Sequence, residues 1–441
     1  MVGSERKHLS ADALFSMVHT SFAKIPDHRV GRPAISLADA LMSAFAMFSL
    51  KCPSLLQFDE QQREDENIRS IYRIGRVPCD TQIRTIIDPL EPEALRPIFR
   101  DVFRQVQRGK ALEQFVCLEG CYLLCLDGTG YFSSNKVHCP SCLQRVHRSG
   151  EVTWSHQMLG AALVHPDLKE VIPLCPEPII QQDGQTKNDC ERNAARRFLA
   201  AFRREHPHLP VIVVEDGLGS NGPHIRDLLE HRMHFILGAK PGDHPALFEH
   251  VALRESVGAV TNVTIRDQDP KSDRQHRITI VPDVRLNDSH PDLRVTFVRY
   301  TEWIPSTNQT RTFTWVTDLK VHPGNAWQFV RAARSRWKIE NETFNTLKNQ
   351  GYHFEHNYGH GQQHLSVNLA LLMMLAFLVD QVLQRCNDLF RATWHKVGSK
   401  RLFWEEMRSI FFHFRLGSMR ELYQTILYGH KKQHPAILNS S

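Results

Sequence analysis

The sequence has little that would direct the protein into or across a membrane. Its first residues, MVGSERKHLSADALF, lack the charged start, apolar run and small-residue cleavage site of a secretory signal. The longest apolar stretch, residues 367–379, is too short to cross about 30 Å of hydrocarbon and contains Asn368. We therefore expect a cytoplasmic protein with no membrane partner, in which this stretch forms a core helix.

A disulfide framework and a strong charge of either sign are also absent. The ten cysteines of this 441-residue chain are expected to stay reduced in the cytoplasm. The formal net charge of +6, with a pI near 8.8, is only mildly basic. Such a charge is compatible with a nucleic-acid partner but does not identify one. Its length gives the chain room for about three domains, and its 41% hydrophobic content is enough to fill their cores.

One pair of cysteines has the spacing of a metal site. Cys139 and Cys142 form a CxxC motif. Three histidines lie close by in the sequence: His138, His147 and His156. Two thiolates and two imidazoles, such as those of His147 and His156, could complete a tetrahedral zinc site, and the alternative is a turn with free thiols. The histidines within residues 352–364 are expected to form a polar loop or to contact DNA rather than metal.

Apolar patterns divide the chain into a helical start and a mixed centre. Helical periodicity runs through residues 1 to about 115, notably at 37–48 and 94–104, and a short helix is predicted near 78–84 with Asp80 or Thr81 as its cap. Strands are predicted near residues 121–127, 153–164, 170–174, 211–215 and 235–239, and helices near residues 188–204 and 222–232. Strands and helices mixed in this way indicate an α/β layer arrangement.

The segment that follows the last of these strands is too long to be a loop in a compact fold. Its apolar residues alternate as in antiparallel strands, near residues 260–265, 277–281, 294–298 and 312–316. We therefore predict a β-rich insertion between this strand and the next helix.

Three acidic residues lie next to apolar segments, where a charged side chain indicates a functional site. Asp127 follows the apolar run YLLCL, and Asp216 ends the run VIVVED, so that each marks the end of a predicted buried strand. On a helical wheel of residues 336–348, Glu340 lies near the centre of the apolar face. A carboxylate there must be paired with a cation, protonated or bound to metal, because an unpaired buried charge costs several kcal/mol. The alternative is an ordinary ion pair between Arg336 and Glu340, one helical turn apart.

Two strand-end aspartates and one glutamate can form a site for divalent cations. Mg²⁺ takes hard oxygen ligands, commonly one or two carboxylates with water and phosphate oxygens. A pair of such ions roughly 4 Å apart activates the attacking oxygen and stabilises the leaving oxygen of a phosphoryl displacement. The same wheel places Glu342 on the opposite, solvated face, so Glu342 is not expected to belong to this site.

These residues carry a resemblance to a known family. Asp127, Asp216 and Glu340 resemble the DDE triad of bacterial insertion-sequence transposases with an RNase H-like catalytic core. The run from Arg336 to Glu340, RWKIE, is similar to the signature of the group in which a Tyr, an Arg, the catalytic Glu and a Lys share one helix. The likeness extends over about residues 118–385. It implies a mixed sheet flanked by helices, with a β-rich insertion and helical N- and C-terminal regions.

Two positions depart from that signature. Ala333 stands where the Tyr is expected, and Lys348 lies eight rather than seven residues after Glu340. The resemblance still implies that Arg336 and Lys348 contact DNA phosphates. Further candidate DNA contacts are Trp337, Lys240, Arg192 and Arg196. Trp337 is otherwise expected in the core, and the two arginines share with Arg203 a helix stripe that is otherwise a solvated face.

The resemblance also implies an organisation into successive regions. These are a helical region at residues 1–115 for binding DNA ends, a first core part at 116–250, the β-rich insertion at 251–318, a second core part with the Glu helix at 319–385, and a helical region at 386–441. Scattered arginines of the first region, such as Arg69 and Arg84, are candidate phosphate contacts.

The implied activity is metal-dependent DNA transposition. The triad would bind two Mg²⁺ or Mn²⁺ ions, cut at the terminal inverted repeats of a mobile element and join the ends to target DNA. Pairing two ends requires more than one copy, so a homo-oligomer is expected on DNA. Two alternatives stay open: a metal-dependent nuclease of the same fold, and a catalytically inactive DNA-binding regulator.

Overall fold

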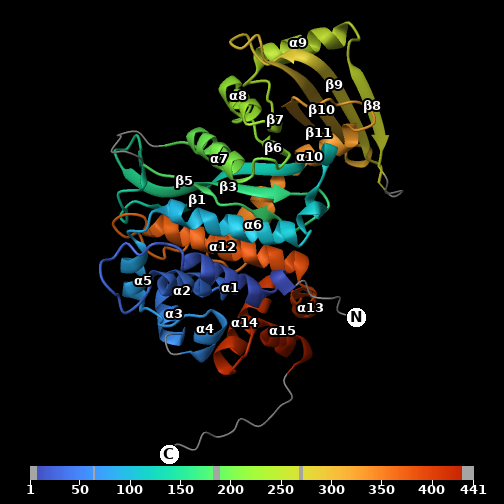
Figure 1. Cartoon of the computed structure of the whole chain (residues 1–441). Coiled ribbons are helices and arrows are strands. Elements are labelled where there is room, and N and C mark those ends of the chain that lie inside the picture. Colours follow the sequence, from blue (N-terminus) through green and yellow to red (C-terminus); the bar gives the residue numbers. More distant parts are fainter. Residues whose placement is uncertain (1–6, 63–64, 182–188, 268–271, 430–441) are drawn as a thin grey trace, which may run out of the picture.

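A computed structural model of the chain shows one long mixed sheet between layers of helices (Figure 1). It describes residues 7–62, 65–181, 189–267 and 272–429. The predictions for residues 1–6 and 430–441, and for the start of a helix at residue 188, lie outside the described residues. The arrangement confirms the predicted α/β class and is consistent with an RNase H-like fold.

Short helices make up the N-terminal region, as predicted. They are α1 (Ala11–Phe22), α2 (Leu37–Ser49), α3 (Leu55–Gln62), α4 (Glu66–Ile71), α5 (Asp80–Ile87) and α6 (Arg96–Arg108), with 3₁₀ turns η1 (Lys7–Leu9), η2 (Pro92–Leu95), η3 (Leu112–Phe115) and η4 (Leu118–Gly120). The predicted cap of α5 is wrong by one residue. The helix begins at Asp80, so Cys79 is the N-cap residue. The backbone N–H of Cys79 donates a hydrogen bond to Oε1 of Gln82.

Eleven strands form the sheet among the described residues. They are β1 (Tyr122–Ser134), β2 (Leu143–Val146), β3 (Val152–Val164), β4 (Ile172–Pro173), β5 (Glu177–Ile179), β6 (Val211–Glu215), β7 (His234–Gly238), β8 (Thr261–Arg266), β9 (Gln275–Arg285), β10 (Arg294–Ile304) and β11 (Gln309–Thr317). Their order is β2-β3-β1-β6-β7-β11-β10-β9-β8, and β4 and β5 pair with β3. Strands β1, β6 and β7 are parallel to one another.

The four strands predicted for the insertion are present as β8 to β11, and they extend the core sheet. β11 pairs antiparallel with β7, with Val316 opposite Leu237. Alternation along a strand predicts the strand itself, but it does not reveal which neighbour that strand pairs with. The insertion region therefore shares a continuous sheet with the core, and the 3₁₀ turn η5 (Pro305–Thr307) joins β10 to β11.

The remaining helices lie over the faces of this sheet or, at the C-terminal end, pack with the N-terminal region. They are α7 (Glu191–Glu205), α8 (Gly222–Glu230), α9 (Pro245–Ser256), α10 (Ala326–Arg334), the π-helical turn η6 (Ile339–Phe344), α11 (Asn345–Asn349), α12 (Leu365–Cys386), α13 (Asp388–Val397), α14 (Lys400–His413) and α15 (Met419–Tyr428). In Figure 1, α7 lies on one face of the β1 and β3 region, and α6 and α12 lie on the other.

The apolar stretch at residues 367–379 forms the middle of α12, which is a core helix as predicted. Among the described residues α12 alone is long and apolar enough to cross a membrane, yet 94% of its apolar window is buried inside the protein. Asn368 is fully buried and donates to the carbonyl oxygens of Ile87 and Leu90, at 3.1 and 2.7 Å. The helix is thus built to pack against the N-terminal region.

Candidate catalytic site

Asp127 and Asp216 lie at matching positions on two adjacent parallel strands. β1 pairs with β6 so that Cys125 is opposite Val214. Continued by two residues, the same register places Asp127 opposite Asp216, and neighbouring strands are only about 4.8 Å apart. Both residues line one pocket at this edge of the sheet. The crevice beyond the carboxyl ends of strands is where open α/β sheets commonly bind ligands.

Glu340 reaches the same place from the segment between α10 and α12. Its Oε1 lies 2.7 Å from Nη1 of Arg336, and the same Nη1 lies 3.4 Å from Oδ2 of Asp127. The negative charge of Glu340 is close enough to contribute to the raised pKa of Asp127. The three acidic residues predicted from the sequence are therefore brought together, with one guanidinium between two of them.

The structure corrects the burial predicted for Glu340. Its side chain is 47% exposed, and the ion pair with Arg336 that was the alternative prediction is present. The wheel assumed 100° per residue, but α10 ends at Arg334 and the chain then forms a π-helical turn, which has more residues per turn. π-helical turns occur frequently at functional sites. Glu342 lines a separate pocket with Lys169 and Lys400.

Close packing against a glycine brings the π-helical turn next to the sheet. Gly160 of β3 pairs with Asp127 of β1. A Cβ atom at Gly160 would lie only 2.6 Å from ring atoms of Phe344, which is buried at the end of the turn. The lack of a side chain at residue 160 therefore sets how closely the segment that bears Glu340 can approach the strand that bears Asp127.

We expect Gly160→Ala to destabilise the protein by about 1–3 kcal/mol, the usual cost of overpacking a core. The reason is the contact between the new methyl group and Phe344. Denaturant unfolding measures the change. In a Phe344→Leu background the same substitution should cost clearly less, because the ring atoms it meets are gone. Equal costs in both backgrounds would show that the two residues do not set this spacing.

The electrostatics of the site indicate that it lacks positive charge. Burial raises the pKa of Asp127 to about 7, against the opposing charge of Arg336 and with the negative charges of Glu340 and Asp216 adding to the rise. One guanidinium thus does not compensate for the clustered carboxylates. Hard oxygen ligands with uncompensated negative charge are the donor set that a divalent cation such as Mg²⁺ prefers.

A comparison with known families decides the class of the protein. The family model described as the transposase DDE domain matches residues 147–378, which is more than half of the chain. The chain belongs to this transposase family. The match contains Asp216 and Glu340 and begins after Asp127, whose place beside Asp216 follows from the strand register alone. The family implies DNA as a partner and divalent metal ions in general. No curated protein matches the chain.

The transposase has a further acidic residue at this pocket that was not predicted. Glu191 is the first residue of α7, and a Cβ atom at Gly128 would lie 2.1 Å from its Oε1. The carboxylate therefore lies over the strand residue that follows Asp127. Burial, with the charges of Asp216 and Glu215, raises the pKa of Glu191. Its position at a helix start is visible in the sequence, but nothing there places it beside β1.

Glu215 precedes Asp216 and has a different partner. It is buried, and its Oε2 lies 2.6 Å from Nε2 of His224. Burial lowers the pKa of His224, but the charge and hydrogen bond of Glu215 outweigh this effect and raise it. Glu215 is thus occupied by an internal pair, whereas Asp216 is half-buried and accepts from the backbone N–H of Leu218.

The arginine stripe predicted on α7 is only partly available for DNA. Arg192 is exposed and lines the acidic pocket. Arg196 is also exposed but pairs with Asp227 at 3.0 Å. Arg203 donates to backbone carbonyl oxygens, including that of His231 at 2.7 Å, and so holds the end of the helix instead.

The other predicted DNA contacts of the transposase also differ in their surroundings. Lys240 follows β7 and is exposed. Lys348 pairs with Glu355 at 2.9 Å. Trp337 is 46% exposed, so the expectation that it belongs to the core is wrong. Ala333, at the position of the signature Tyr, is buried and does not replace it at the site.

The predicted zinc ligands are brought together with one correction. Cys139, Cys142 and His156 cluster in the structure, and the fourth donor is His360. His147 lies apart from them, with its Nε2 2.8 Å from Oγ1 of Thr153. The loop at residues 352–364 folds back onto the connection after β1, a long-range contact that sequence spacing does not show. His360 of this loop, expected to contact DNA or to lie in a polar loop, is instead buried in the cluster.

Proposed function

We propose that this transposase cuts DNA at the ends of its own mobile element and joins them to target DNA, with Asp127, Asp216 and Glu340 as its catalytic residues. The observation that carries this proposal is the convergence of the three carboxylates from the adjacent parallel strands β1 and β6 and one π-helical turn. Burial and the repulsion between these carboxylates both raise the pKa of Asp127, a cost that a purely structural cluster would not need.

The three carboxylates would hold two Mg²⁺ or Mn²⁺ ions. When bound, such ions activate the attacking oxygen and stabilise the leaving oxygen of phosphoryl transfer. Asp127 and Asp216 are fixed by their strands, which suits residues that must keep a set spacing. Glu340, on an irregular turn and 47% exposed, has freedom to adjust its carboxylate. Glu191 is placed to accept hydrogen bonds from water in the same pocket.

Arg336 would serve the site in two ways. In this structure its guanidinium lies between Asp127 and Glu340 and reduces their repulsion. A guanidinium has five N–H donors and suits bidentate contact with phosphate, so Arg336 is also placed to hold a DNA phosphate next to the carboxylates. Lys348 would add a point charge further along the same segment once it leaves Glu355.

DNA would approach across the exposed basic residues near the acidic pocket, among them Arg192 and Lys240. We expect Arg192→Ala and Lys240→Ala each to weaken binding to DNA of any sequence several-fold. Each should also reduce the slope of log binding constant against log salt concentration by about one. Arg104→Ala is a matched control, because Arg104 is 52% exposed but lies on α6, on the other face of the sheet. Titrations at several salt concentrations measure the effect; equal losses in all three variants would contradict this path.

The remaining regions support assembly on DNA. The helical region at residues 1–115 is proposed to bind the element ends, with exposed arginines such as Arg69 and Arg84 as phosphate contacts. In the C-terminal region, α15 packs against α1 of this N-terminal region. Joining two ends requires at least two copies at some stage, so self-association on DNA is part of the proposal.

The proposed reaction is tested with DNA that carries the inverted repeats flanking the gene. Purified protein, Mg²⁺ or Mn²⁺ and a target plasmid should give cuts at the repeat ends and then covalently joined products. Cutting without joining would instead identify a nuclease. Binding of the ends without any cutting in either metal would identify a regulator.

A further inference from the structure

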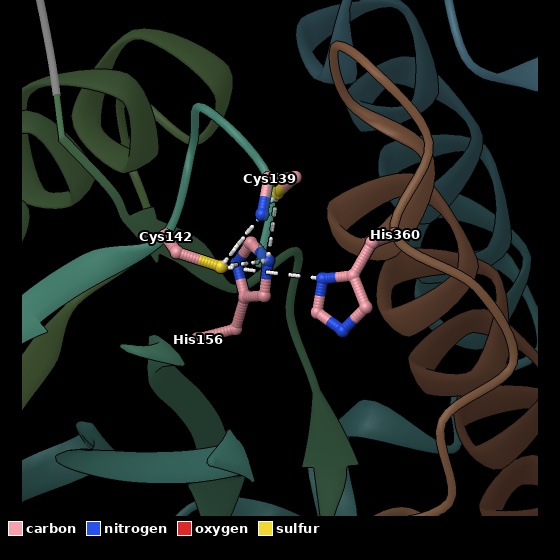
Figure 2. Close-up of side chains that lie close together, drawn as sticks. All are labelled: Cys139, Cys142, His156 and His360. Atoms are coloured by element: carbon pink, nitrogen blue, oxygen red, sulfur yellow. Dashed lines mark hydrogen bonds between the residues drawn. The ribbon is translucent and has the colours of Figure 1, made fainter. Parts of the chain in front are cut away.

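We propose that the protein binds one structural zinc ion through Cys139, Cys142, His156 and His360. The two cysteines lie in the connection between β1 and β2, His156 lies on β3, and His360 lies in the loop before α12 (Figure 2). None of these residues belongs to the acidic site. The proposal therefore stands independently of the DNA chemistry proposed above.

The distances between the donor atoms match a tetrahedral site. With Zn–S near 2.3 Å and Zn–N near 2.0 Å, tetrahedral geometry separates two sulfurs by about 3.8 Å, and sulfur from nitrogen by about 3.5 Å. The two Sγ atoms are 3.7 Å apart, and they lie 3.2 and 3.3 Å from Nε2 of His156. Nδ1 of His360 is 4.0 Å from Sγ of Cys142. All four donor atoms lie within 4.8 Å of one another.

Hydrogen bonding alone does not account for this cluster. All four residues are buried, and Figure 2 shows both imidazole rings directed toward the sulfurs. The two thiols and Nε2 of His156 form a triangle of contacts. Two thiol protons and one nitrogen lone pair satisfy at most two sides of that triangle with good geometry. A single cation at the centre satisfies all of the donors together.

The surroundings are those of a closed, structural site. The ring of Phe132 lies 4.0 Å from that of His360, and the ring of Tyr131 stacks at 5.6 Å on His156. These side chains cover the cluster with apolar surface. Structural zinc sites have four protein ligands of this kind, whereas catalytic sites keep a position open for water or substrate. Zinc held here would contribute folding free energy rather than take part in the reaction.

Zinc at this position would fix a segment that leads from the acidic site. His360 follows Glu340 by twenty residues, in the loop that leads to α12. A second contact joins the same parts, because Oγ of Ser141 donates to the carbonyl oxygen of Gln363 at 2.8 Å. The zinc ion would thus hold this loop against the β1 and β3 hairpin, whose first strand carries Asp127.

The test is elemental analysis of protein purified without chelator. We expect about one zinc per chain in the wild type, and less than about a tenth of that in His360→Ala and in the Cys139→Ser/Cys142→Ser variant. His147→Ala and His364→Ala should keep full zinc, because neither residue belongs to the cluster. Limited proteolysis should cut residues 352–364 faster in the zinc-free variants, a readout that does not depend on transposition.

Substitution by Co²⁺ covers the case in which the cysteine variant does not fold. Cobalt bound to the wild-type protein should show the absorption of tetrahedral Co²⁺ with thiolate ligands, and His360→Ala should lose it. Substoichiometric zinc in the wild type, or unchanged zinc content in His360→Ala, would overturn the proposal and leave Cys139 and Cys142 as reduced thiols.

Discussion

Asp127→Asn, Asp216→Asn and Glu340→Gln should each lower the rate of DNA end cleavage by at least about a thousandfold. Each substitution keeps the volume of the side chain but removes a negatively charged ligand. Loss of metal-assisted charge stabilisation is worth several kcal/mol, and about 4 kcal/mol corresponds to a thousandfold in rate. Thermal stability and binding of the DNA ends should remain close to wild type, since Glu340 is exposed and neither aspartate supports the core.

Glu342→Gln is the matched control for this series. Glu342 lies two residues from Glu340 on the same turn but lines a pocket with Lys400 on the other side. This variant should cleave at close to the wild-type rate. If cleavage survives in Glu340→Gln and is lost in Glu342→Gln, the catalytic residue is Glu342 and the role proposed for Glu340 is wrong.

The largest expected effect on stability is at a buried ion pair between the N-terminal region and α12. Nζ of Lys51 lies 2.6 Å from Oδ2 of Asp380, and both side chains are almost fully buried. The hydroxyl of Tyr352 donates to the same oxygen, also at 2.6 Å. Burial lowers the pKa of Lys51 and raises the pKa of Asp380, so each charge depends on the other.

Asp380→Ala should therefore destabilise the protein by about 3–5 kcal/mol, because it leaves the ammonium of Lys51 buried without a counter-charge. Denaturant unfolding measures the loss. The double variant Lys51→Met/Asp380→Leu should recover most of it, since two apolar side chains of similar size remove both buried charges. If the double variant is as unstable as Asp380→Ala, packing rather than charge accounts for the loss.

Local patterns were sufficient to predict much of the fold. Apolar runs predicted β6, which ends beside Asp216, and the first part of β1, although β1 continues past Asp127 to Ser134. The length of the apolar stretch around Asn368 predicted a core helix. These predictions succeed because a buried strand or helix must be apolar along its own sequence. The π-helical turn at Glu340 was not predicted, because the helical wheel assumed a regular α-helix through this segment.

Contacts between distant segments explain the other differences. Glu191 and His360 each reach a cluster through tertiary packing, and their own neighbours in sequence give no sign of it. The pairing of β11 with β7 is of the same kind, since alternation in a strand does not specify its partner. For the same reason the sequence grouped Cys139 and Cys142 correctly but placed His147 with them, where the structure places His360.

The central claim is that Asp127, Asp216 and Glu340 form the metal site for cutting DNA. It is tested most directly by anomalous diffraction from crystals of the protein bound to an element end in Mn²⁺. We predict two manganese peaks about 4 Å apart, each about 2.1 Å from carboxylate oxygens of these residues. Manganese bound elsewhere, with Arg336 still between Asp127 and Glu340 and no peak beside Asp216, would contradict the account.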